Sequence, residues 1–339
     1  MRMRGVSLPR LVVVTRKTPM EALKARHGTI GQAKFFLSAQ RQKADWFEQA
    51  DGQLQAGLAA VLAALPSDRR RTRIDRDDVD RFVFEAEDIV IAVEQDGLVA
   101  NVAKYLDGQV LIGVNPDPSR YDGVLCRVLP DRVAAAIAWV SAGGGSEFRM
   151  ESRALALVTR EDGQRLHALN EVFIGHASHQ SARYVLQVAG KQERQSSSGI
   201  LCVTGTGATG WGHSIARQRG GGVEFPEPTE RGLTWLVREP FPSVSTGAKL
   251  QAGRIEDGKS LVVASEMGER GVIFADGIET DALEFTSGQL VTVRVADRVL
   301  RLLTTGPARP QRPPAERPVV TQRKGDRGAN RKAPPPDQR

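Results

Sequence analysis

Apolar runs and their spacing predict an α/β arrangement in the first part of the chain. Leu11 to Val14 is a compact β-branched run, which predicts a buried strand. Asp88 to Val93 is continuously apolar after its first residue, as expected of a strand covered on both faces. Leu98 to Leu106 has helical spacing, and Val110 to Val114 predicts a further strand. The last three segments together predict a β-turn-α-β unit.

A long helical region separates the first two of these strands. Residues 18 to 21 give a helix-start signal, with Thr as the N-cap, Pro at the first helical position and Glu as the capping-box acid. From Pro19 to Leu65 the apolar positions have helical spacing, with a break predicted at Gly28 and Gly31. We therefore expect an α/β domain over residues 1–130.

The pattern changes after about Leu125. Ala134 to Val140 is a short helix candidate, and the segments that follow alternate between apolar and polar residues. Regular short strands of this kind predict an all-β, sandwich-like second domain. The strand candidates are Arg153 to Thr159, Leu166 to Ile174, Arg183 to Val188, Ile200 to Thr204, Thr234 to Arg238, Ser260 to Ala264, Gly271 to Phe274 and Gln289 to Val295.

The net charge of +7 is concentrated at the C-terminal end of the chain. Nine basic and three acidic residues after position 304 account for six of the seven net positive charges. Prolines are frequent there and apolar residues are almost absent, so residues 305–339 are predicted to form a disordered basic tail. The rest is nearly neutral, so nucleic-acid contact is expected only as nonspecific contact of the tail.

Length and composition favour two domains of ordinary size in a chain of 339 residues. No apolar run approaches the roughly 20 residues needed to span a bilayer. The run from Leu11 to Val14 is shorter than the roughly 7 residues of a signal-peptide core. Cys126 and Cys202 are the two cysteines, too few for a disulfide framework. We expect a soluble, cytoplasmic protein.

Three polar sites interrupt the apolar pattern and are candidates for chemistry. Asp96 follows a predicted strand and precedes a helix, where open α/β sheets bind ligands. Gly97 would permit a sharp turn and close approach of a ligand. Asn170 and Glu171 lie inside an apolar segment. Residues 204–209 (Thr-Gly-Thr-Gly-Ala-Thr) follow a predicted strand and offer backbone amides to an anion or a nucleotide.

Each of these sites also has a plainer interpretation. Asp96 could cap the following helix, the Asn-Glu pair could point outward, and the loop could be a surface connection. His176 and His179 lie three residues apart with no third ligand apparent, so no protein metal site is predicted. The pair at 276–277 (Asp-Gly) predicts a hairpin turn.

The order and spacing of these motifs resemble the NAD kinase family. That family has a Gly-Gly-Asp-Gly turn after a strand, then an Asn-Glu pair, then a Thr-Pro-Thr-Gly-Ser-Thr-like loop. Residues 94–97, 170–171 and 204–209 stand in the corresponding places. The chain is more similar still to the mitochondrial-type branch, through residues 113–118 (Gly-Val-Asn-Pro-Asp-Pro), 169–175 (Leu-Asn-Glu-Val-Phe-Ile-Gly), 197–199 (Ser-Ser-Gly) and 237–240 (Val-Arg-Glu-Pro). The resemblance covers roughly residues 10 to 303.

The resemblance implies a fold and a reaction. It implies an α/β nucleotide-binding domain, a β-rich NAD-binding domain over residues 131–290, and a return of residues 291–304 to the first domain. In that family the turn aspartate acts on the adenosine 2′-hydroxyl of NAD. This hydroxyl then attacks the terminal phosphate of ATP or polyphosphate in the presence of a divalent metal, Mg or Mn, and gives NADP. A homodimer or larger assembly is also implied.

Roles for individual residues follow from the same resemblance. Asp96 would be the general base or would orient the hydroxyl, because phosphoryl transfer mostly needs aligned oxygens. Asn170 and Glu171 would hold the NAD ribose. The other residues expected to bind substrate are Gly97, Asn115, Thr204, Thr206, Gly207 and Thr209.

The chain departs from the family pattern just before Asp96. Glu94 and Gln95 replace the two glycines, which adds side chains and a negative charge where phosphate is expected to approach. Two alternatives to an NAD kinase therefore stay open: a non-catalytic NAD(P)-binding regulator, and a lipid or sugar kinase of the same superfamily. The Asn-Glu pair argues against the lipid or sugar kinase because it suits a ribose.

Overall fold

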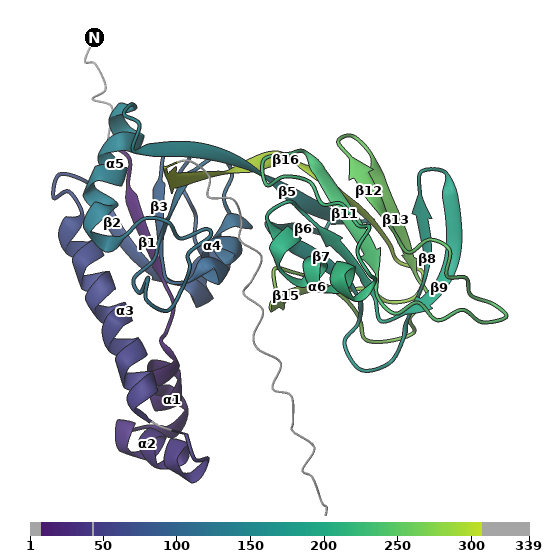
Figure 1. Ribbon diagram of the computed structural model, residues 1–339, viewed down its shortest axis with the longest axis horizontal. Coiled ribbons are helices and arrows are strands. Elements are labelled where there is room, and N and C mark those ends of the chain that lie inside the picture. Colours follow the sequence, from purple (N-terminus) through teal and green to yellow (C-terminus); the bar gives the residue numbers. More distant parts are fainter. Residues whose placement is uncertain (1–7, 43, 307–339) are drawn as a thin grey trace, which may run out of the picture. The chain divides into compact units, whose positions relative to one another are not determined.

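Four parallel strands form the centre of the N-terminal part (Figure 1). They are β1 (Leu11–Thr15), β2 (Arg71–Asp75), β3 (Ile89–Val93) and β4 (Val110–Val114), in the spatial order β2, β1, β3, β4. The computed structural model describes residues 8–42 and 44–306 of the chain. Every residue of β1, β3 and β4 is buried, as their continuous apolar runs predict.

Helices cover both faces of this parallel sheet. They are α3 (Ala44–Ala64), α4 (Asp96–Ala103) and α5 (Val133–Ala142). Val12 and Val14 of β1 share an apolar core with α4, whereas Leu11 and Val13 share another with α3 and α5. Alternate residues of one strand thus reach two cores, so the α/β class predicted for this part is confirmed.

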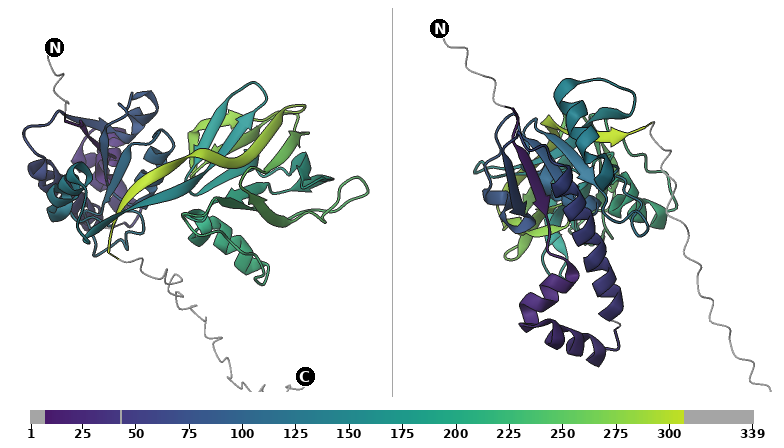
Figure 2. Two further views of the ribbon diagram at one scale, coloured as in Figure 1. Left: turned by 90° about the horizontal axis from the view of Figure 1, so that it is seen from above. Right: turned by 90° about the vertical axis from the view of Figure 1, so that its left-hand side faces the viewer.

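Two shorter helices, α1 (Pro19–His27) and α2 (Ile30–Ala39), precede α3 and pack against it (Figures 1 and 2). The predicted capping box is present, because the Thr18 hydroxyl accepts from the Glu21 amide and the Glu21 carboxylate accepts from the Thr18 amide. Gly28 ends α1 with a φ of 83°. Thr29 then caps α2, so Gly31 lies inside a helix and not at the break.

Two antiparallel layers with an apolar core between them form the β-rich part, which confirms the predicted sandwich. One layer has the order β12, β11, β10, β7, β14, β15, and the other contains β5, β6, β8, β9, β13 and β16. The bounds are β5 Phe148–Arg160, β6 Arg165–Ala168, β7 Glu171–His176, β8 Ala182–Val188, β9 Lys191–Ser197, β10 Ile200–Val203, β11 Gly232–Val237, β12 Ala252–Glu256, β13 Ser260–Ser265, β14 Gly271–Ala275, β15 Ile278–Glu284 and β16 Leu290–Thr305. The remaining elements are α6 (Trp211–Gln218) and the 3-10 helices η1 (Arg76–Arg81), η2 (Pro130–Arg132) and η3 (Gly207–Thr209).

Strand β16 belongs to both parts of the chain. Its residues 290–294 pair antiparallel with β13, whereas residues 301–303 pair in parallel with β4. Strand β5 runs beside β16 from residue 148 to residue 160, so the two parts share one sheet (Figures 1 and 2). The last part of β16 thus lies beside β4.

Four strands were not expected from the sequence: β2, β9, β12 and β15. All four lie at the outer edges of their sheets, where polar side chains face water and weaken the apolar pattern. The segment predicted as one strand from Leu166 to Ile174 is two strands, because the chain turns at Leu169 and Asn170.

Apart from residues 305 and 306, the predicted tail lies outside the described residues. Within residues 8–42 and 44–306, no helix is long and apolar enough to cross a membrane.

Candidate functional site

Asp96 lies at the junction of β3 and α4, at the carboxyl end of the parallel strand. Its carboxylate accepts three backbone hydrogen bonds, from the amides of Val124 at 2.8 Å, Leu125 at 2.8 Å and Cys126 at 2.9 Å. The N-cap of α4 is Gln95, and no side chain caps that helix. Asp96 therefore does not cap its own helix but fixes a distant loop, which we call the Asp96 clamp.

Two glycines let the clamped loop lie close to the sheet. Gly123 has a φ of +64°, and a Cβ atom there would lie 2.3 Å from the Cys126 carbonyl oxygen. A Cβ atom at Gly113 in β4 would lie 2.5 Å from the Leu125 carbonyl oxygen. By contrast, Gly97 has no left-handed backbone conformation and has open space where a Cβ atom would be. The sharp turn expected at Gly97 is therefore wrong, since Gly97 is an ordinary residue of the first turn of α4.

Asp276 makes a second clamp in the β-rich part. Its carboxylate accepts from the backbone amides of Leu169 at 2.9 Å, Asn170 at 2.7 Å and Glu171 at 3.2 Å. Asp276 and Gly277 are the two loop residues between β14 and β15, with φ values of 55° and 69°. This is the predicted hairpin turn, and positive φ at both positions is typical of type I′. The Asp276 clamp holds the Asn-Glu pair in a turn, with Glu171 as the first residue of β7.

Burial changes the acidity of both carboxyl groups at this clamp. It raises the pKa of Glu171 to about 7, and the nearby charge of Asp276 adds to that rise. Burial also raises the pKa of Asp276 to about 6, although the three amide hydrogen bonds and the charge of Lys104 oppose the rise. Near neutral pH, Glu171 thus changes readily between a hydrogen-bond donor and an ionised acceptor.

Helix α4 connects the two clamps. Asp96 is its first residue, and Lys104 is its C-cap. The buried Lys104 ammonium lies 2.5 Å from a carboxylate oxygen of Asp281 in β15, and the Tyr105 hydroxyl donates to the same oxygen at 2.8 Å. Lys104 also donates to the Ala275 carbonyl, one residue before Asp276, at 3.4 Å. The helix that starts at the Asp96 clamp therefore ends against the hairpin of the Asp276 clamp.

The loop at 204–209 folds directly onto the Asn-Glu turn. The Thr204 amide donates to the Asn170 carbonyl at 2.9 Å, and its hydroxyl accepts from the amides of Thr206 and Gly207. A Cβ atom at Gly207 would lie 2.2 Å from the Asn170 carbonyl oxygen, so only glycine fits there. Thr204 is fully buried and orders the loop. Thr209 is exposed, and direct contact of these residues with substrate stays a prediction.

Comparison with known proteins finds similarity in part of the sequence and in the fold. No protein-family model matches the chain. The chain is 31% identical to the mitochondrial NAD kinase 2 of Rattus norvegicus over 199 residues. These residues make up 44% of this chain and 46% of that protein. The chain thus matches about half the length of this curated relative. Its fold is similar to the crystal structure of an NAD kinase from Archaeoglobus fulgidus in complex with ATP, with a TM-score of 0.51, 15% identity and coverage of 87% of this chain and 93% of that one. The chain is thus similar to NAD kinases over part of its sequence and in its fold.

Within this NAD kinase-like fold, Glu94 lines a cavity of about 550 Å³ at the carboxyl ends of the parallel strands. Burial raises the pKa of Glu94, although Arg16, whose guanidinium lies 3.5 Å from the carboxylate, opposes the rise. Lys17 pairs with Asp77 at 3.0 Å on the same wall. The two glycine replacements, Glu94 and Gln95, therefore place side chains in the cavity wall.

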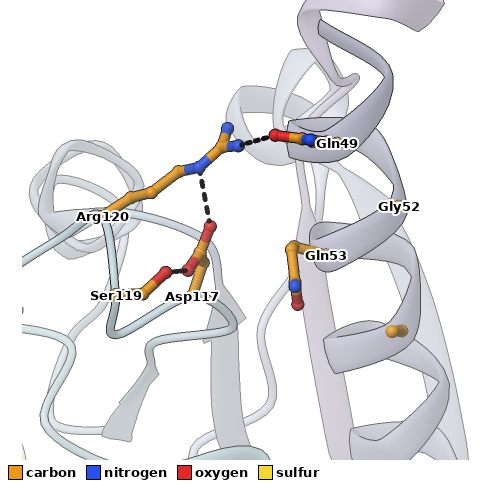
Figure 3. Close-up of a pocket in the computed structure, with 7 residues that line it drawn as sticks. Gln49, Gly52, Gln53, Asp117, Ser119 and Arg120 are labelled. Atoms are coloured by element: carbon orange, nitrogen blue, oxygen red, sulfur yellow. Dashed lines mark hydrogen bonds and ion pairs between the residues drawn. The ribbon is translucent and has the colours of Figure 1, made fainter. Parts of the chain in front are cut away.

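Asn115 is buried and closes the loop after β4. Its amide nitrogen donates to the Tyr121 carbonyl at 2.8 Å, and its carbonyl oxygen accepts from the Asp117 amide at 3.0 Å. Asp117 in turn accepts from Ser119 and pairs with Arg120, beside a second cavity against α3 (Figure 3). Both polar atoms of Asn115 are thus used within the loop, and its predicted contact with substrate stays a prediction.

An aromatic stack lies beside the 204–209 loop. Trp211 stacks on Phe173 with ring centroids 5.5 Å apart, and Phe173 stacks on Phe274 at 4.9 Å. The Arg238 guanidinium lies 5.0 Å from the Trp211 ring centroid. Trp211 therefore has an aromatic partner and a cationic one within the protein, which favours packing over base stacking.

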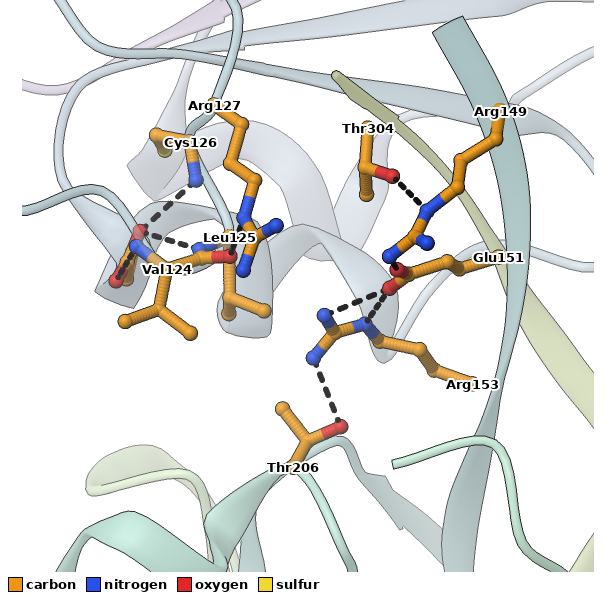
Figure 4. A network of polar contacts seen from close by, with 10 residues as sticks. Val124, Leu125, Cys126, Arg127, Arg149, Glu151, Arg153, Thr206 and Thr304 are labelled. Atoms are coloured by element: carbon orange, nitrogen blue, oxygen red, sulfur yellow. Dashed lines mark hydrogen bonds and ion pairs between the residues drawn. The ribbon is translucent and has the colours of Figure 1, made fainter. Parts of the chain in front are cut away.

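Three arginines that the sequence patterns did not single out lie around Glu151 and the Asp96 clamp (Figure 4). Arg153 donates two hydrogen bonds to one carboxylate oxygen of Glu151 and reaches the Thr206 hydroxyl at 3.4 Å. Arg149 pairs with the other Glu151 oxygen, and Arg127 donates to the Val124 carbonyl at 3.1 Å. A lone arginine in a loop or within a strand gives no periodic signal, so only the folded chain brings these side chains together.

Proposed function

We propose that the protein is an NAD kinase, which transfers a phosphoryl group from ATP, or from another nucleoside triphosphate or polyphosphate, to the adenosine 2′-hydroxyl of NAD. The similarity to NAD kinases supports a phosphotransferase of this kind. The observation that carries the proposal is the Asp96 carboxylate, which is partly exposed and rigidly held at the carboxyl end of β3. This is the edge at which open α/β sheets bind nucleotides.

The backbone amides of the Asp96 clamp leave one acceptor position, which a substrate hydroxyl would share with the neighbouring Cys126 thiol. A carboxylate has about four acceptor positions, and three backbone amides fill three of them. Oδ1 accepts from Leu125 and Cys126, whereas Oδ2 accepts from Val124 alone. A ribose hydroxyl that donates to Oδ2 would be aligned by a fixed partner, which is the main requirement of phosphoryl transfer.

The proton and the phosphoryl group then move in opposite directions. The 2′ oxygen attacks the terminal phosphorus of the donor, and its proton passes to Oδ2 of Asp96. The bond between that phosphorus and its bridging oxygen breaks, and the shortened donor leaves with the electron pair. NADP and a nucleoside diphosphate are the products when the donor is a nucleoside triphosphate.

The Asn-Glu pair supplies the polar groups for the NAD ribose in this proposal. Glu171 is half-buried at the start of β7, and its backbone amide is fixed by Asp276. With a pKa of about 7, Glu171 accepts a hydrogen bond from a ribose hydroxyl in its ionised form. Asn170 offers an amide side chain from the same turn.

The divalent metal of the proposed reaction is placed with the donor. Across residues 8–42 and 44–306, no three His, Cys, Asp or Glu side chains converge as a metal site. Mg²⁺ keeps several waters and is usually bound through substrate phosphates with one or two carboxylates. We therefore place the metal on the phosphate chain of the donor, where it would neutralise charge during transfer.

The direct test is NADP formation by the purified full chain with ATP, GTP and inorganic polyphosphate, each with Mg²⁺ or Mn²⁺. We expect NADP with at least one donor. Absence of NADP with all of them would exclude the kinase. Calorimetry with NAD and NADP then separates the two other possibilities, because binding without turnover identifies a regulator, and no binding of either points to another substrate.

A further inference from the structure

Three arginines around the Asp96 clamp form a positively charged group, the arginine cluster of Arg127, Arg149 and Arg153 (Figure 4). Arg127 follows directly on Cys126, the last amide that Asp96 binds. Burial lowers the pKa of Arg153, and the nearby charges of Arg127 and Asp96 act on that pKa in opposite directions. The cluster therefore borders the carboxylate that the proposed reaction uses.

The cluster carries more positive than negative charge. Glu151 is its one internal carboxylate and is shared by Arg149 and Arg153. These two arginines outweigh the effect of burial and lower the pKa of Glu151, so this group stays ionised. Arg127 makes no ion pair among the residues that the structure describes, and the one hydrogen bond of its side chain there uses Nε. Its two terminal nitrogens are free to bind an anion.

The cavity beside Glu94 is the other candidate for an anion, and its charges are balanced. Three basic residues line it together with three acidic ones: Arg16, Lys17, Arg76, Asp77, Glu94 and Asp117. Arg16 and Lys17 already pair with carboxylates there. A polyanion gains little from such pairs, whereas the arginine cluster keeps a net positive charge even when the neighbouring Asp96 carboxylate is counted.

We propose that the arginine cluster binds the phosphate chain of the phosphoryl donor, with Arg127 as its principal contact. Guanidinium groups bind phosphate oxygens with paired hydrogen bonds, and Arg127 offers such a pair. Arg153 links the cluster to Thr206, so the bound phosphates lie between the Asp96 clamp and the 204–209 loop. This site takes the role that glycines before Asp96 would otherwise have. The inference rests on the proposed kinase function for the identity of the anion.

The test measures phosphate binding without any turnover. Inorganic tripolyphosphate is titrated into the full chain by calorimetry, for the unsubstituted protein, for Arg127→Gln and for Arg149→Gln. Arg16→Gln, from the balanced cavity, is the matched control. Loss of one charge-assisted phosphate contact predicts about a tenfold weaker Kd for Arg127→Gln. Arg127 and Arg149 are both partly exposed, so the thermal midpoint of each variant should remain close to that of the unsubstituted protein.

Two arms identify the source of the anion. The Kd of a nonhydrolysable ATP analogue should rise in Arg127→Gln by the same factor as the Kd of tripolyphosphate. The Kd of NAD should stay unchanged. An unchanged tripolyphosphate Kd in Arg127→Gln, or an equal loss in Arg16→Gln, would overturn the proposal. The binding test does not depend on NADP formation. If the protein binds tripolyphosphate through Arg127 but forms no NADP, the kinase function is refuted and the anion site remains.

Discussion

The Asp96 clamp and the Asp276 clamp use the same chemistry in two different parts of the chain. Each is an Asp-Gly pair whose carboxylate accepts from three consecutive backbone amides. Each also has a buried cation nearby, Arg153 for Asp96 and Lys104 for Asp276. The two clamps differ in what the fixed loop presents, because one loop leads to Arg127 and the other carries Asn170 and Glu171.

In the proposed reaction, this difference gives the two clamps different ligands. The loop held by Asp96 continues into a positive cluster, which suits phosphate. The loop held by Asp276 presents an amide and a carboxyl group, which suit sugar hydroxyls. Bringing the hydroxyl and the phosphate together is the task of a kinase, so the two loops serve the two substrates of the proposed reaction.

The largest expected effect is a loss of turnover when the carboxylate of the Asp96 clamp is replaced. Asp96→Asn removes the proton acceptor, so we expect kcat for NADP formation to fall about 100- to 10,000-fold. The asparagine NH₂ group also faces backbone donors, which removes at least one hydrogen bond and costs about 1–3 kcal/mol of stability. Steady-state kinetics at 20 °C with a urea unfolding curve measure both effects. A kcat within threefold of the unsubstituted protein would show that Asp96 serves the loop alone.

The same substitution at the other clamp should act on binding. Asp276→Asn loosens the turn of Asn170 and Glu171, so we expect KM for NAD to rise about tenfold while kcat changes little. The free energy of unfolding should fall by about 1–3 kcal/mol, because a buried amide loses its acceptor. If Asp276→Asn instead lowers kcat as much as Asp96→Asn does, the division of roles between the clamps is wrong.

The sequence predicted the central strands of the fold because strands buried on both faces consist of continuous apolar residues. β1, β3 and β4 are buried on both faces and are continuous apolar runs. The missed strands β2 and β9 end the ten-stranded sheet, and β12 and β15 end the six-stranded one. An edge strand has one hydrogen-bonded neighbour and tolerates polar residues, so periodicity does not reveal it.

Motifs made of neighbouring residues could also be predicted from the sequence. Hydrogen bonds between residues far apart in the sequence could not. Asp96, the Asn-Glu pair and the 204–209 loop each stand out as polar or small residues beside apolar runs. No spacing rule links Asp96 to the amides 28 to 30 residues later. Likewise, Asp276 gives a clear turn signal, but its bonds to a loop more than 100 residues earlier depend on the pairing of β14 with β7.

The smallest expected effect is a pH dependence that belongs to the Asp276 clamp. Burial raises the pKa of Glu171 to about 7, well above its ordinary value of 4.5, so the folded chain binds this proton more tightly than the unfolded chain. The resulting stability is fully present below about pH 4.5 and is lost as the pH rises through about 7. The raised pKa of Asp276, about 6, acts in the same direction. The free energy of unfolding should therefore fall by up to about 1.4 kcal/mol per pH unit for each group in this range.

Urea unfolding curves at half-unit steps from pH 5 to pH 8 measure this dependence. Glu171→Gln has no titrating group at position 171. The fall in the free energy of unfolding between pH 6 and pH 7 should therefore flatten in that variant, while the contribution of Asp276 below pH 6 remains. Asp96→Asn leaves the Asp276 clamp intact and should keep the slope of the unsubstituted protein. An equal slope in Glu171→Gln would show that Glu171 is ionised throughout this range and would remove the pH-dependent difference between the two clamps.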